Sequence, residues 1–219
     1  MIITIDGLGG TGKSSQAREL ARKINFKSFD TGAMYRAITL KLIEYNIDPR
    51  NTDILIDVLN NTNVQFNEHQ VILDNIDVSK RIRQMDITLN SAYIATIKEI
   101  KQKVTQIQRD FGNSNDVVME GRDIGTRIFP NAEIKFYLEA SPEVRARRKF
   151  LEGKDEKLSY EDILKKLLER DKVEIIAESI QIPKDAFRIN TDNMTFQDVN
   201  EQITQITMQK MNTLERWFL

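Results

Sequence analysis

The chain has 219 residues, of which 40% are hydrophobic and 30% charged, and its 32 basic and 33 acidic side chains give a net charge of −1. This composition is typical of a globular protein of one domain or slightly more, and it disfavours a non-specific nucleic-acid binder, which is usually basic. The absence of cysteine excludes disulfides and thiolate zinc sites and favours a cytoplasmic protein, while the single histidine, His69, disfavours histidine metal clusters and Ser-His-Asp triads.

Hydrophobic periodicity predicts strands that alternate with helices along the chain. The start is strand-like with no basic segment before it, and no apolar run is long enough to cross a membrane, so we expect neither a signal peptide nor a membrane protein. The expected strands are residues 1–6, 26–30, 116–119, 134–138 and 187–190, and the expected helices are residues 13–24, 33–45, 82–111, 142–151, 159–172 and 196–217. This alternation predicts an α/β fold with a central parallel sheet covered on both faces.

Two segments depart from this alternation. Residues 49–80 are rich in Asn and Asp, and the apolar runs 64–66 and 71–73 flank a short polar stretch, which predicts a small β-hairpin. We interpret this stretch as an insertion into the main domain. Residues 153–157 are entirely polar or glycine, and we expect them to be mobile.

A glycine-rich segment follows the first expected strand and opens the first expected helix. It matches the phosphate-loop pattern G-x-x-x-x-G-K-[ST] without a mismatch, and Ser15 follows it. The matching residues are Gly7, Leu8, Gly9, Gly10, Thr11, Gly12, Lys13 and Ser14. The glycines let backbone N–H groups surround a β-phosphate, Lys13 can reach the β and γ oxygens, and the Ser14 hydroxyl can ligate Mg²⁺. The positive end of the helix dipole adds to this attraction, so we predict a nucleoside-triphosphate site.

Charged residues also follow two other expected strands, in segments 30–36 and 120–126, and a basic cluster lies at 145–148. Ligands of open α/β sheets bind at the carboxyl ends of the strands, where the first two segments fall. The third is close to the polar segment 153–157, as expected of a lid whose arginines neutralise transferring phosphates. The chain lacks the Asn-Lys-x-Asp string of a GTPase. The phosphate loop and these separate charged segments together favour phosphoryl transfer between two small phosphorylated molecules.

The strings DTGAMYR at 30–36 and EGRDIGT at 120–126, together with Phe129-Pro130-x-Ala132 and the phosphate loop, resemble the bacterial cytidylate kinases. The resemblance covers roughly residues 2–192. It implies a phosphate-loop sandwich with a small β-containing nucleotide-binding insertion at about 49–95 and a mobile, arginine-bearing lid at about 145–178. It further implies a monomer that uses Mg²⁺ and ATP to phosphorylate CMP or dCMP.

The same resemblance implies roles for individual residues. Thr31, Lys101 and Asp123 would contact the base, and Arg36 and Arg122 would hold the acceptor phosphate, which suits guanidinium forks. Lys13, Arg145 and Arg148 would stabilise the transferring group. Arg170 would reach the sugar or the phosphates, with Glu174 near the pentose.

The chain departs from the family pattern at three of these places. Lys101 stands where a base-contacting arginine is usual, Glu174 where an aspartate is usual, and Ala177 where a lid arginine is usual. The alternatives to a CMP kinase are a kinase for another monophosphate, such as UMP or dTMP, and a degenerate paralogue that binds nucleotide without turnover.

Overall fold

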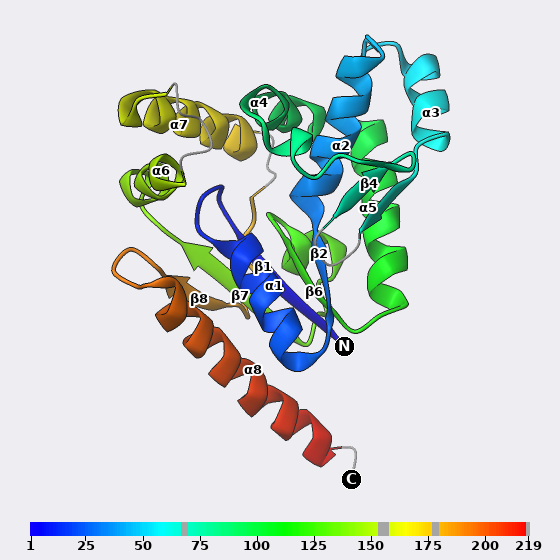
Figure 1. Ribbon diagram of the computed structural model, residues 1–219. Coiled ribbons are helices and arrows are strands. Elements are labelled where there is room, and N and C mark those ends of the chain that lie inside the picture. Colours follow the sequence, from blue (N-terminus) through cyan, green and yellow to red (C-terminus); the bar gives the residue numbers. More distant parts are fainter. Residues whose placement is uncertain (67–69, 153–157, 177–179, 218–219) are drawn as a thin grey trace.

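The computed structural model describes residues 1–66, 70–152, 158–176 and 180–217. At its centre is a five-stranded parallel sheet with the order β2-β6-β1-β7-β8 (Figure 1). The strands are β1 (Ile2–Gly7), β2 (Lys27–Asp30), β6 (Val117–Gly121), β7 (Ile134–Glu139) and β8 (Phe187–Asn190). All five of the expected sheet strands are therefore confirmed, with ends that differ by a residue or two. In the register, Asp6 lies beside Gly121 and Asp30 beside Glu120, so the polar strand ends meet at one edge.

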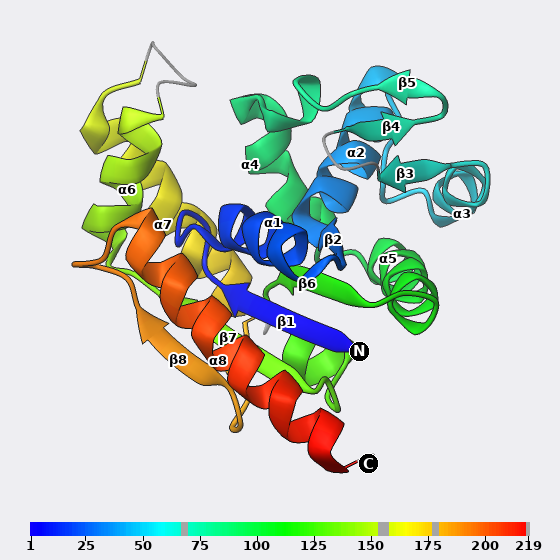
Figure 2. The same cartoon turned by 60° about the horizontal axis from the view of Figure 1, so that its bottom comes forward.

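Helices cover both faces of this sheet because successive side chains of each buried strand point to opposite sides. On β6, Val118 packs with residues of α1 (Lys13–Ile24) and α8 (Phe196–Trp217). Figure 2 shows these two helices together on one face. Val117 and Met119 pack on the other face against α2 (Thr31–Glu44) and α5 (Lys98–Asn113).

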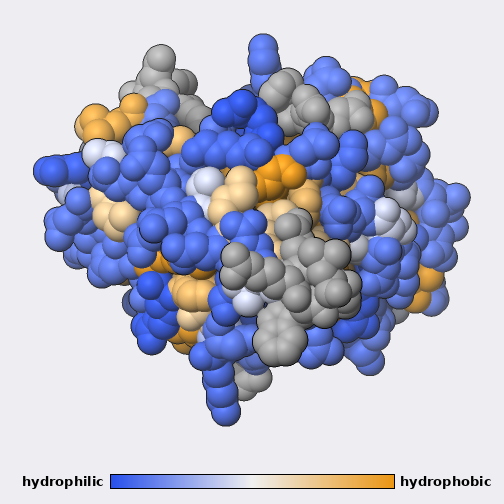
Figure 3. Space-filling model, turned by 90° about the horizontal axis from the view of Figure 1, so that it is seen from below, coloured by the Kyte–Doolittle hydropathy of each residue, from blue (hydrophilic) through white to orange (hydrophobic). Residues whose placement is uncertain are grey.

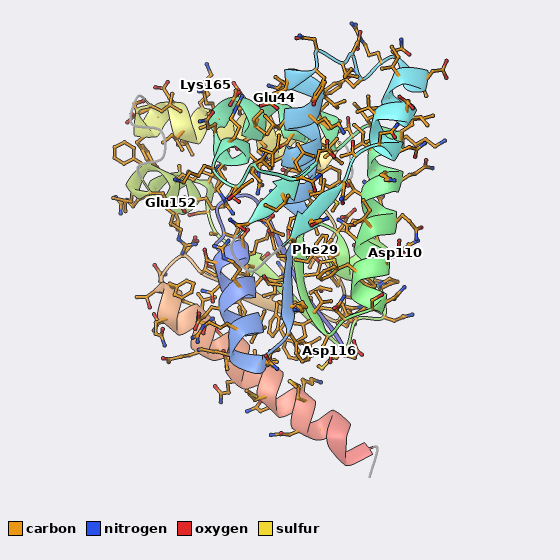
Figure 4. All side chains as sticks on the ribbon, turned by 45° about the vertical axis from the view of Figure 1, so that its right-hand side comes forward. Phe29, Glu44, Asp110, Asp116, Glu152 and Lys165 are labelled. Carbon is orange, nitrogen blue, oxygen red and sulfur yellow. The ribbon has the colours of Figure 1, made fainter. Side chains whose placement is uncertain are left out.

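Phe29 connects the sheet with the apolar core that lies on its α2 and α5 face. Its ring lies 4.7 Å from the ring centroids of both Phe66 and Phe111. It is fully buried and lies between β2 and α5 (Figure 4). The sheet, the insertion and α5 therefore share one apolar core, which fixes their relative positions.

The insertion contains more helix than the sequence predicts. Between α2 and α5 the chain forms α3 (Thr52–Asn60), β3 (Val64–Phe66), β4 (Val71–Leu73), β5 (Ile76–Asp77), the 3₁₀ turn η1 (Arg81–Arg83) and α4 (Met85–Ile94). The three strands form an antiparallel sheet that includes the expected hairpin, whose loop residues 67–69 lie outside the described part. Helix α3 is not predicted by its Asn-rich sequence. The Asn51 side chain caps it by accepting a hydrogen bond from Ile54 N, and Leu55 and Leu59 bury its inner face.

The mostly helical structure expected over 82–111 is confirmed, and the chain forms it as two separate helices, α4 and α5. The Thr96 hydroxyl donates to Tyr93 O at 2.7 Å, and Ile97 adopts an extended backbone conformation before α5 begins. A side chain that bonds to the last turn competes with continuation of the helix. The break allows α4 to lie across the carboxyl edge of the sheet.

Helices α6 (Pro142–Leu151) and α7 (Tyr160–Ile176) complete the fold, along with the π-helical segment η2 (Ile124–Ile128). Helix α4 lies between α2 and α7 and contacts both (Figure 1). The segment 153–157, which we expect to be mobile, lies outside the described residues. Among the described helices, none combines the length and hydrophobicity that membrane crossing requires. The face of the molecule shown in Figure 3 is mostly hydrophilic, with hydrophobic residues gathered in small areas.

Candidate active site

One cavity opens at the carboxyl edge of the parallel sheet. Its walls come from the phosphate loop, from the first turns of α2, from the end of β6, and from helices α4, α5, α6 and α7. Segments that are far apart in the sequence therefore meet around a single space. This is the edge at which ligands bind in open α/β sheets.

The phosphate loop forms the floor of the cavity between β1 and α1. Gly10 and Gly12 have φ values of 86° and 90°, a backbone conformation that is favourable only for glycine. The Thr11 hydroxyl donates to Leu8 O at 2.9 Å and holds the loop closed. Lys13 Nζ lies 3.3 Å from Leu8 O and 3.7 Å from Glu120 Oε2. Burial, together with the nearby charge of Arg122, lowers the pKa of Lys13 to about 8.

Two carboxyl groups lie beside the loop at the ends of neighbouring strands. Ser14 Oγ donates to Glu120 Oε1 at 2.8 Å. Burial and the charge of Asp30 raise the pKa of Glu120 to about 7. Burial would also raise the pKa of Asp30, but Arg36 and a hydrogen bond from Glu120 hold it below its usual value. The pKa of Glu120 is thus raised and that of Asp30 lowered, although the two carboxyl groups are adjacent.

These oxygens fit a magnesium ion. Mg²⁺ prefers hard oxygen ligands and is usually held by one or two carboxylates together with substrate phosphates. Ser14 supplies a hydroxyl, and Glu120 and Asp30 supply carboxyl oxygens. Within the described ranges, no three acidic, histidine or cysteine side chains are grouped as a metal site of their own. A cation here would therefore depend on phosphate oxygens as well.

Three arginines, Arg36, Arg122 and Arg170, also line the cavity. Arg36 pairs with Asp30 at 3.3 Å, and its Nε is buried without a hydrogen-bond partner. Arg122 makes a bidentate contact with Glu174 at 2.7 and 3.2 Å, and Arg170 Nε donates to the same carboxylate at 2.8 Å. Burial opposes ionisation of Glu174, but the two guanidinium groups lower its pKa below the usual value. Glu174 therefore holds two cations in place at the cavity wall.

Asp123 lines the same cavity at the start of η2. Lys101 Nζ and Arg127 Nη1 lie 3.8 and 3.5 Å from its Oδ2, yet this buried oxygen accepts no hydrogen bond. Burial raises the pKa of Asp123. The loop that carries it is fixed by Asp6 of β1, whose carboxylate accepts from Ile124 N at 3.0 Å and Gly125 N at 2.8 Å. The strand that leads into the phosphate loop thus also positions Asp123.

Comparison with known proteins decides the family. A sequence model of cytidylate kinases matches residues 3–209. The chain belongs to the cytidylate kinase family. It is 40% identical over 204 residues to the cytidylate kinase of Fusobacterium nucleatum, covering 91% of this chain and 93% of that one. It is 36% identical over 212 residues to the cytidylate kinase of Caldicellulosiruptor saccharolyticus, covering 93% and 94% of the two chains.

A solved structure of a Thermus thermophilus protein is similar in fold to this cytidylate kinase family member. Its TM-score is 0.51 at 17% sequence identity, and the match covers 96% of this chain and 97% of that one. At this identity the likeness concerns the fold alone, and it agrees with the expected α/β architecture.

Most of the site residues predicted from the sequence line the cytidylate kinase cavity. They are Gly9, Gly10, Lys13, Ser14, Thr31, Arg36, Lys101, Arg122, Asp123, Arg170 and Glu174. Thr31 is held by donating its hydroxyl hydrogen to Glu120 O at 2.7 Å. Gly7, Leu8, Thr11 and Gly12 shape the loop from behind, and Ser15 lies in the first turn of α1. Ala177, which replaces the family arginine, lies outside the described residues.

Arg145 and Arg148 differ from expectation, because neither lines the cavity. Arg145 is 1% exposed and makes a bidentate pair with Asp171, at 2.7 and 3.2 Å. It also donates to the backbone oxygens of Ala140 and Gly9. Arg148 donates to the backbone oxygen and the hydroxyl of Thr191. Helix α6 lies behind the phosphate loop, so these two side chains support the loop and the neighbouring strand end.

The cavity also contains polar residues that the sequence analysis did not assign. Glu120 could have been found, since an acid at the end of a buried strand is a recognised signal. Gln108 interrupts an otherwise apolar helix face, which is a weaker signal. Arg83 lies 3.9 Å from Asp30, and burial lowers its pKa, but nothing in the local sequence distinguishes it from a surface arginine.

Proposed function

We propose that this protein transfers the γ-phosphoryl group of ATP to CMP or dCMP, with Mg²⁺, and releases ADP and CDP or dCDP. The observation that carries the proposal is the composition of one cavity. Lys13 and Ser14 of the phosphate loop line it together with Asp123 and with the three arginines Arg36, Arg122 and Arg170. Membership of the cytidylate kinase family supports the same reaction.

The triphosphate would bind at the phosphate loop. The backbone N–H groups of the loop and the N-terminus of α1 attract the β-phosphate. Lys13, when protonated, stabilises negative charge on the β and γ oxygens. Ser14 and Glu120, with Asp30 beside them, would hold Mg²⁺, and the bound ion would neutralise charge on the phosphate oxygens.

The acceptor nucleotide would lie between the arginines and Asp123. Arg36 and Arg122 present guanidinium groups suited to bidentate contact with its phosphate. Asp123 has a carboxyl oxygen free to accept from an exocyclic amine, which cytosine has and uracil lacks. Lys101 adds a donor for the base carbonyl. Little covalent chemistry is required of the protein, so alignment of the two phosphates and charge stabilisation supply most of the rate.

Four further features belong to this proposal. The stretch from about 49 to 95 serves as the acceptor-binding insertion and that from about 145 to 178 as the lid. The monomeric state and the cytoplasmic location stay predictions from the sequence.

The test is ADP release from Mg-ATP by the purified protein, measured with a panel of ribo- and deoxyribonucleoside monophosphates. We expect stimulation by CMP and dCMP far above that by UMP, dTMP, AMP or GMP. Lys13→Ala should abolish this stimulation while leaving the circular dichroism spectrum unchanged. Preferential use of UMP or dTMP would contradict the proposal, as would ATP binding without turnover on any monophosphate.

A further inference from the structure

Gln108 is a buried amide on an otherwise apolar face of α5. The inward-facing residues of this helix are Ile100, Val104, Gln108 and Gly112, and they recur every fourth residue. Ile100 and Val104 are fully buried, and Gln108 is 2% exposed. An apolar side chain would suit such a position, whereas a buried amide is unfavourable unless its polar atoms are hydrogen-bonded. The choice of glutamine at this position therefore needs a reason.

No hydrogen bond within the described protein provides that reason. The Oε1 atom of Gln108 is buried and has no hydrogen-bond partner, which is rare for a buried polar atom in a native protein. Its side chain lies in the wall of the active-site cavity. An unpartnered amide at the wall of a ligand cavity indicates that the ligand supplies the partner.

The surroundings of Gln108 show which part of the ligand this is. Asp123 lines the same cavity, and its buried Oδ2 also accepts no hydrogen bond. Lys101 lies about two helical turns before Gln108 on α5 and 3.8 Å from Asp123. All three residues thus line the cavity in which the proposed function puts the base of the acceptor nucleotide, beside Asp123.

We propose that Gln108 determines specificity by accepting one N–H of the 4-amino group of cytosine, while Asp123 accepts the other. The inference rests on the proposed function. An exocyclic amine has two N–H donors, and the cavity presents two acceptor oxygens without partners. Uracil has a carbonyl oxygen at that position, so its lone pairs would face the Asp123 carboxylate and leave both oxygens unpaired. A site built for a donor strongly rejects an analogue that lacks it.

The experiment compares CMP, UMP and the 4-deamino analogue of CMP, which carries hydrogen in place of the amine, as acceptors. In Gln108→Leu we expect kcat/KM for CMP to fall by about tenfold, the effect of losing one hydrogen bond at a desolvated site. The value for the 4-deamino analogue should change by less than about twofold, because that ligand has no amine to lose contact with. The KM for ATP should also stay the same. Gln102→Leu, on the exposed side of the same helix, is the matched control and should behave like the wild type.

The stability of the variants separates this role from a structural one. Because Gln108 Oε1 has no hydrogen-bond partner in the described part of the chain, Gln108→Leu and the unbranched Gln108→Met should melt no lower than the wild type. If one of them fails to fold, the other carries the kinetic test. Equal losses on CMP and the 4-deamino analogue, or an unchanged preference for CMP, would overturn the inference. Lack of CMP-stimulated turnover in the wild type would instead refute the proposed function itself.

Discussion

At the scale of the residue, Lys13 must be charged to do its work, and its surroundings make that charge costly. Burial and Arg122 lower its pKa to about 8, while Glu120 at 3.7 Å opposes this shift. A lysine with a lowered pKa is a cation below that pH and neutral above it. As the pH rises through about 8, the free enzyme should therefore lose the positive charge on Lys13 that stabilises the transferring phosphoryl group.

We expect kcat/KM for ATP to be level between pH 7 and 7.5 and to fall above about pH 8, approaching a tenfold loss per pH unit, since this parameter reports on the free enzyme. Lys13→Arg should be slower but lack this alkaline limb, because an arginine stays charged. Initial rates at low ATP across pH 6.5–10 give the profile. A level profile up to pH 10 in the wild type would contradict a lowered pKa for Lys13.

At the scale of the element, α7 is held against the catalytic edge by ion pairs rather than by apolar packing alone. Asp171 pairs with Arg145 behind the phosphate loop, and Glu174 pairs with Arg122 at the end of β6. Arg145 is 1% exposed, so its positive charge is stabilised by this carboxylate and by backbone oxygens in place of water. Breaking a buried pair by removing one partner leaves an uncompensated charge.

Asp171→Ala should therefore lower the free energy of unfolding by about 3–5 kcal/mol, the usual cost of orphaning one member of a buried pair. Urea denaturation followed by circular dichroism measures it. Glu19→Ala removes the partner of Arg22 in an exposed pair and serves as the control, with an expected change too small to measure. Equal effects in the two variants would show that the buried pair is no more important than the exposed one.

At the scale of the whole molecule, the cavity joins segments that the chain order keeps apart. Helix α4 contacts both α2 and α7, and residues of all three helices line the cavity. Ligands that bind between these parts favour the folded state over the unfolded one by mass action. Each substrate should then stabilise the protein independently through its own end of the cavity.

Mg-ATP and CMP should each raise the melting temperature, with a gain in stability of about 2.7 kcal/mol at a hundred times the dissociation constant. Lys13→Ala should lose most of the Mg-ATP shift and keep the CMP shift, whereas Asp123→Asn should do the reverse. Differential scanning fluorimetry with each ligand alone reports both. Loss of both shifts in either variant would mean that the two ends of the cavity do not act as separate sites.

The elements that can be predicted from the sequence are those whose signals are local. The glycines at 7–14 allow the left-handed backbone found at Gly10 and Gly12. Short apolar runs that alternate with helical segments predicted the five parallel strands. Because parallel strands end at a common edge, the segments 30–36 and 120–126 could also be expected to meet there. These predictions depend only on backbone preferences and on the burial of strands, both of which are written in consecutive residues.

The tertiary structure alone decided which side chains complete one another across that edge. The i,i+4 spacing on α7 suggests the pair of Glu174 with Arg170, but nothing local to Glu174 predicts that it also binds Arg122. The basic cluster that carries Arg145 predicts a lid, although α6 places this residue behind the loop. The role proposed for Gln108 becomes apparent only from the cavity that this residue lines. The physical reason is that the periodicity of a helix tells which residues share a face, whereas the identity of the neighbour on that face is set by packing between segments far apart in the chain.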